Sequence, residues 1–128
     1  MGKEPEQWFK QAQYDLSTAE AMFDAKKYIY VIFMCHLAIE KALKGLYSKK
    51  FGNIPPKVHN LLFLLEKIGV SLPSPLSETV FELNRASIPT RYPEDLQQMK
   101  KDYPRQKSEQ LLVQSKEVLK WLKKELRK

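Results

Sequence analysis

The segment from Tyr28 to Lys50 constrains the fold more than any other part of the chain. Its first twelve residues, Tyr28 to Ile39, contain no Asp, Glu, Lys or Arg. A helix over this run is apolar on every side, as expected of a buried central helix. Twelve uncharged residues are also too few to cross a bilayer, which needs about 20. The segment therefore predicts a central helix in a protein core.

Other segments carry apolar residues at steps of three or four, which is typical of helices that bury one face. These expected helices cover residues 5–25, 57–68, 74–86 and 104–128, and Ser74 is a plausible N-cap before Pro75. The stretch "SIPTRYPEDL", residues 87–96, contains two prolines and is predicted to be an ordered loop. No segment alternates at period two, so no sheet is expected. We predict an all-α protein, an up-and-down antiparallel bundle of four to five helices in one domain over residues 1–128.

The charge balance is basic, with 22 Lys and Arg against 15 Asp and Glu, which gives a net charge of +7. This excess favours polyanionic partners such as nucleic acid or nucleotides, although it also serves simple solubility. The opening residues "MGKEPEQW" carry acid and lack the apolar stretch of a signal peptide. We therefore expect a cytoplasmic protein that does not act on membranes.

Three polar residues interrupt the apolar central segment at steps of four: His36, Glu40 and Lys44. Four-residue spacing places them on one face of a helix. His36 and Glu40 could begin a metal site, but a third ligand is not signalled nearby, so no metal is predicted. Two interpretations stay open: a carboxylate-oriented histidine at a site, or the polar edge of a packed helix.

A second constellation lies in "NRASIPTRYPED", where Arg85, Arg91 and Tyr92 stand within eight residues. Guanidinium groups grip oxyanions in a fork, and aromatic rings stack on bases. The alternative is that Arg91 ties the loop to Glu94 or to a helix C-terminus. His59, in "PPKVHNLL", is either a capping residue or a site residue.

The C-terminal segment carries a basic stripe at helical spacing. Its members are Lys116, Lys120, Lys123 and Arg127. Such a stripe can follow phosphates or simply form a solvated outer face.

Taken in order, "HLAIEKALK", "KVHNLLFLL" and "RYP", followed by a C-terminal helix, resemble the HEPN domain family over nearly the whole chain. The resemblance implies a helical bundle that is usually dimeric. Small members are commonly encoded beside a minimal nucleotidyltransferase and are thought to bind nucleotide or substrate for it. Others are metal-independent ribonucleases, often toxins of toxin–antitoxin pairs. The positions that match the family's characteristic residues are His36, Glu40, Lys41, Lys44, His59, Arg91 and Tyr92.

The ribonuclease members carry an arginine followed four to six residues later by a histidine. Here both His36 and His59 precede Arg85 and Arg91, so the general acid–base partner is missing from its expected place. We therefore expect a homodimeric, non-enzymatic binding module without catalytic residues or cofactors. Its expected partners are a nucleotide or RNA and a nucleotidyltransferase subunit. The expected ligand-binding residues are His36, Glu40, Lys41, Lys44, His59, Arg85, Arg91 and Tyr92.

Two other functions remain open from the sequence. One is a ribonuclease or toxin in which a displaced histidine, His36 or His59, works with Arg91. The other is an interaction protein that binds no small ligand.

Overall fold

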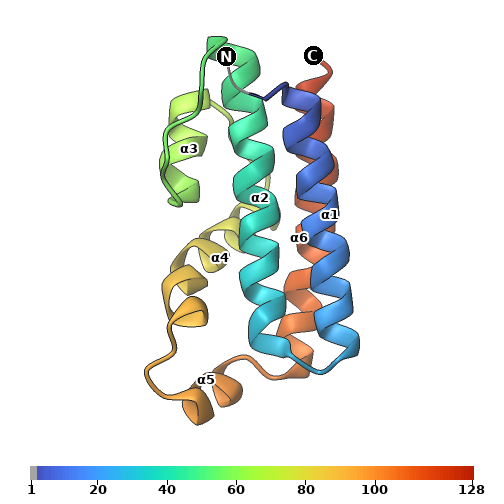
Figure 1. The fold of residues 1–128 in the computed structure, drawn as a ribbon, viewed down its shortest axis with the longest axis vertical. Coiled ribbons are helices and arrows are strands. Elements are labelled where there is room, and N and C mark those ends of the chain that lie inside the picture. The colour runs from blue at the N-terminus through green and yellow to red at the C-terminus, as the bar shows by residue number, and fades with distance from the viewer. Residues whose placement is uncertain (1–2) are drawn as a thin grey trace.

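Six helices and no strand form residues 3–128, the part of the chain that this computed structural model describes. The helices are α1 (Pro5–Asp24), α2 (Tyr28–Phe51), α3 (Leu61–Ile68), α4 (Leu76–Arg91), α5 (Leu96–Asp102) and α6 (Arg105–Leu126). In Figure 1, α1 runs down, α2 up, α4 down and α6 up, and the two termini lie at the same end. This arrangement confirms the predicted all-α, up-and-down bundle, with a sixth helix beyond the expected four to five. Between residues 3 and 128, no helix is both long and apolar enough to span a bilayer.

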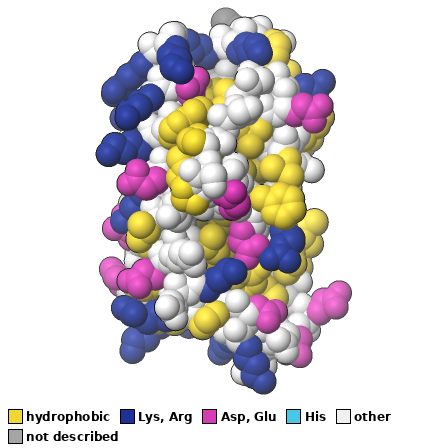
Figure 2. Space-filling model, turned by 180° about the vertical axis from the view of Figure 1, so that it is seen from behind, with side chains coloured by type: hydrophobic (Ala, Val, Ile, Leu, Met, Phe, Trp, Pro, Cys, Tyr) yellow, Lys and Arg dark blue, Asp and Glu magenta, His cyan; other side chains and the backbone are white. Residues whose placement is uncertain are grey.

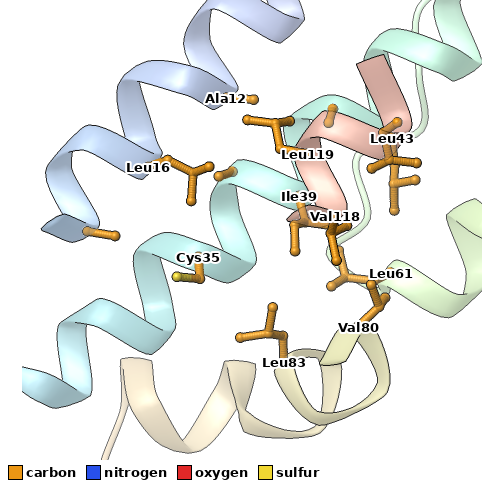
Figure 3. Packing of buried hydrophobic residues seen from close by; sticks show 14 of the residues in the cluster. Ala12, Leu16, Cys35, Ile39, Leu43, Leu61, Val80, Leu83, Val118 and Leu119 are labelled. Atoms are coloured by element: carbon orange, nitrogen blue, oxygen red, sulfur yellow. The ribbon is translucent and has the colours of Figure 1, made fainter. Parts of the chain in front are cut away.

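The long helix α2 is the central element, in contact with α1, α3, α4 and α6. Figure 3 shows Cys35 and Ile39 of α2 surrounded by apolar side chains of α1, α4 and α6. Both are fully buried. Burial raises the pKa of the Cys35 thiol to about 12, so this cysteine acts as a small core residue. At Gly45, a Cβ atom would come within 2.9 Å of the Trp8 Cβ, so the missing side chain lets α1 and α2 pack closely.

The predicted loop over residues 87–96 is wrong in its first half, because α4 continues through Pro89 to Arg91. Ala86 and Thr90 are buried on the inner side of this last turn. The Thr90 hydroxyl donates a hydrogen bond to the Ala86 carbonyl at 2.7 Å. Pro89 lies on the exposed side of the helix. Proline has no N–H, so the helix loses one backbone hydrogen bond here, but the packing of its buried neighbours keeps the turn helical. Arg91 therefore lies on a helix end.

Two further helix starts differ from prediction. Ser74 does not cap α4; its hydroxyl donates to the Glu78 carboxylate at 2.9 Å, and the helix begins at Leu76. The unexpected α5 begins after Asp95, whose carboxylate accepts a hydrogen bond from the Gln98 N–H at 3.1 Å. Such a cap satisfies a free donor of the first turn, which favours a short helix here.

Candidate functional site

A buried carboxylate, Glu40, organises the polar residues of α2. Its Oε2 accepts a hydrogen bond from Lys44 Nζ at 3.0 Å, and its Oε1 accepts one from His59 Nδ1 at 2.9 Å. The side chains of Glu40 and Lys44 are only 5% and 10% exposed, whereas that of His59 is 61% exposed. We refer to His36, Glu40, Lys44 and His59 as the Glu40 network. The network engages Nδ1 of His59, whose side chain stays mostly exposed.

His36 belongs to this network but is fully buried. Its Nε2 lies 3.0 Å from the His59 carbonyl oxygen, and only a protonated nitrogen can donate to a carbonyl. In the neutral ring Nδ1 therefore carries no proton; it has no hydrogen-bond partner and lies 3.9 Å from Glu40 Oε1. Burial lowers the pKa of His36 to about 4 and outweighs the nearby carboxylate. His36 is thus neutral near pH 7 and holds the backbone at His59.

Arg91 projects from the last turn of α4 and is half-buried. Its guanidinium carbon lies 4.8 Å from the centroid of the Phe33 ring, a cation–π contact. Its Nε is buried and has no hydrogen-bond partner. Within residues 3–128 no carboxylate lies within ion-pair distance of Arg91, so the expected alternative of a pair with Glu94 is not formed.

A pocket of about 360 Å³ lies beside this arginine. Its lining residues are His59, Asn60, Asn84, Ser87, Ile88, Arg91 and Tyr92, and none is acidic. We call it the Arg91 pocket. The structure thus brings together His59, Arg91 and Tyr92 from the expected set. His36, Glu40 and Lys44 do not line the pocket, and their contact with it runs through His59.

Two asparagines of this pocket were missed by sequence reasoning. Asn60 caps α3: its side chain accepts a hydrogen bond from the Phe63 N–H at 3.0 Å, so this helix begins at Leu61 instead of Lys57. An asparagine directly before an apolar helical run is a recognisable cap signal. Asn84 accepts a hydrogen bond from the Leu61 N–H at 2.7 Å and joins α4 to α3. That contact depends on the tertiary fold and has no sequence signal.

Lys41 and Arg85 lie apart from the other expected site residues. Lys41 faces α1, where its Nζ lies 2.9 Å from the Asp15 carboxylate. Arg85 is exposed and lies 2.5 Å from the Glu82 carboxylate, which also binds Lys107. Burial alone would raise the pKa of Glu82, but hydrogen bonds from Arg85 and Lys107 lower it. Both cations are therefore matched by carboxylates of the chain itself.

The basic stripe of α6 does not line the Arg91 pocket. Figure 2 shows Lys and Arg side chains gathered along one edge, toward the end that holds the C-terminus in Figure 1. Lys116 pairs with Glu20 of α1 at 3.1 Å, and Lys120 and Arg127 are exposed. The stripe thus lies on an outer face of the bundle, with Lys123 half-buried.

The chemistry offered by the Arg91 pocket is recognition of an anion. A planar guanidinium and two amide groups can donate hydrogen bonds, and the 76%-exposed Tyr92 ring can stack on a flat group. Over residues 3–128, no three His, Cys, Asp or Glu side chains meet in an arrangement that could hold a metal ion.

Comparisons with known proteins agree with this architecture. The family model of the HEPN domain matches residues 5–126. The crystal structure of TT1696 from Thermus thermophilus superposes with a TM-score of 0.81 at 28% identity, covering 94% of this chain and 96% of that one. The crystal structure of ST0689, an archaeal HEPN homologue, gives 0.76 at 26% identity, covering 97% and 98%. No curated protein sequence matches significantly. The chain belongs to the HEPN domain family.

Proposed function

We propose that this protein is a non-enzymatic binding module that takes the anionic part of a nucleotide into the Arg91 pocket. The observation that carries the proposal is the unmatched guanidinium of Arg91. It is half-buried, has a buried Nε without an acceptor, and borders a pocket without acidic residues. A buried donor without a partner costs free energy, and a bound oxyanion would remove that cost.

The aromatic and amide groups of the Arg91 pocket favour a nucleotide over a simple inorganic anion as the ligand. Tyr92 is 76% exposed at the pocket and offers a ring face for a base. Asn60 and Asn84 supply amide groups whose oxygens are already engaged by the backbone of α3, so their NH₂ groups are free to donate.

A second candidate function is RNA cleavage by a displaced histidine. One observation favours it: His59 shares the pocket with Arg91 and is oriented by Glu40, as a general base would be. His36 is unsuited to this role, because it is fully buried and its Nε2 is engaged by a backbone carbonyl. We place cleavage second because no histidine follows Arg91 at the spacing of the ribonuclease members.

We further propose that two copies associate through the outer face of α4. Phe81 and Ile88 are 56% and 71% exposed along this helix, an unusual display of large apolar side chains. A two-fold dimer would cover the same face on both copies. Sedimentation at micromolar concentration should give a dimer, and a monomer of about 15.0 kDa would contradict it.

A nucleotidyltransferase subunit remains the protein partner suggested by the family resemblance.

The test of the main proposal is calorimetric titration of the purified protein with nucleotides and short RNAs, alongside an RNA-cleavage assay without added metal. Amide NMR shifts locate the ligand. We expect binding, shifts at residues 84–92 and no cleavage. Cleavage lost on His59→Ala would establish the second candidate instead. A titration without shifts at residues 84–92 would remove the Arg91 pocket as the site.

A further inference from the structure

A second pocket lies at the end of the bundle opposite the termini. Figure 1 shows the turn from α1 to α2 and helix α5 together at this lower end. The pocket has a volume of about 470 Å³ and shares no lining residue with the Arg91 pocket. Its lining includes three lysines and three tyrosines, which define what we call the lysine–tyrosine pocket: Lys26, Lys27, Lys100, Tyr28, Tyr30 and Tyr103.

The charge of this pocket is uncompensated. None of its lining residues is acidic, and within residues 3–128 none of its three lysines forms an ion pair. Ammonium groups that share one concave surface repel each other, and an anion of several charges relieves that repulsion. The first turn of α2 adds the same sign, because it contains no acidic residue and no side chain caps it.

The walls of the pocket are aromatic. Tyr28 is held by Phe23, with ring centroids 5.6 Å apart, and Tyr103 is half-buried. Tyr30 lines the pocket and is 50% exposed. A volume of about 470 Å³ lies within the usual range of small-ligand sites. Lysines beside tyrosines form the combination that binds phosphate and stacks on a flat ring.

We propose that the lysine–tyrosine pocket is a second, independent binding site for a small phosphorylated compound that carries a planar ring. Lys27 and Lys100 come from α2's start and α5, so they approach the phosphates from two elements. Tyr30 contacts the ring. Because no lining residue is shared, this site stands or falls independently of the Arg91 pocket.

The test uses the full chain with Arg91→Gln, so that binding at the first pocket is weakened and binding at the second remains. The probes are ATP and inorganic tripolyphosphate, titrated by calorimetry. Adding Lys27→Gln and Lys100→Gln should weaken both probes by about tenfold or more. Both lysines are exposed, so the fold should persist, and far-ultraviolet circular dichroism checks this.

A matched control removes the same charge elsewhere. Lys120→Gln with Lys124→Gln, on the exposed face of α6, should change either affinity less than about twofold. Tyr30→Leu should weaken ATP by about tenfold and leave tripolyphosphate within about twofold. The proposal is overturned if the Arg91→Gln protein binds neither probe at millimolar concentration, or if the α6 control weakens binding as much as the pocket pair. Equal responses of the two probes to Tyr30→Leu would overturn the role of the ring.

Discussion

The Glu40 network and the Arg91 pocket lie next to each other, but the cationic side chain of the first has a carboxylate partner and that of the second has none within residues 3–128. Lys44 is nearly buried and is matched by Glu40 at 3.0 Å. Arg91 has no carboxylate partner within residues 3–128 and stacks on Phe33 instead. A buried cation whose partner is part of the chain makes that partner necessary to the fold, because its removal would leave a buried charge unpaired. A cation without one keeps hydrogen-bonding capacity that a ligand could use, and we therefore propose that Lys44 is structural and Arg91 binds the ligand.

Glu40→Gln tests the structural half of this comparison and should have the largest effect. It leaves Lys44, 10% exposed, without its charged partner. We expect a loss of about 3–5 kcal/mol in the free energy of unfolding, measured by urea denaturation. The matched control is Glu82→Gln, whose partners Arg85 and Lys107 are well exposed, with an expected loss of about 1 kcal/mol or less. Similar losses for both variants would contradict a special role of the buried network.

Arg91→Lys tests the functional half. Lysine keeps the charge but loses the planar fork that holds two oxygens at once. We expect nucleotide affinity to fall by roughly tenfold to a hundredfold, equivalent to about 1.5–3 kcal/mol, with unfolding unchanged. Arg105→Lys is the matched control, since Arg105 also stacks on a phenylalanine, Phe23, but does not line the pocket. If both variants bind alike, the Arg91 pocket is not the site.

The buried His36 makes the stability of the fold sensitive to acid. Its pKa of about 4 in the folded state lies below the ordinary value of 6.5, so the unfolded chain binds the proton first as pH falls. The contribution of neutral His36 to the free energy of unfolding is complete above pH 6.5 and is lost between that value and pH 4. From pH 7 to pH 5 we expect a loss of about 2 kcal/mol in the free energy of unfolding. His36→Gln should be less stable at pH 7 but show a flatter pH dependence, and an unchanged slope would refute this assignment.

The basic stripe of α6 should give the smallest effect. Replacing Lys116, Lys120 and Lys123 by alanine removes charges that lie on an outer face, one of them already paired with Glu20. We expect nucleotide affinity to fall by less than about threefold at low salt and not at all near physiological salt, where exposed charges are screened beyond about 8 Å. Titrations at two salt concentrations measure this. A larger loss than that of Arg91→Lys would move the binding surface to α6.

Much of the fold followed from local pattern. The apolar run that starts at Tyr28 predicted the central helix, and α3 ends at Ile68, the predicted last residue of that helix. The placement of Glu40 and Lys44 on one helix face could also be predicted, because a helix places residues four apart side by side. These features depend on neighbours within one or two turns, so the order of residues is sufficient to predict them.

The sequence by itself determined that the chain is helical and which residue types are available for a site, but the tertiary structure decided which of those residues meet. Burial of Thr90 carries α4 through Pro89 and places Arg91 over Phe33. Lys41, equally polar in sequence, turns to Asp15 on α1 instead. His59 reaches Glu40 from another segment of the chain. The physical reason is that helix formation is governed by local spacing, whereas charge pairing and pocket formation depend on which distant side chains the packed core brings within a few ångströms.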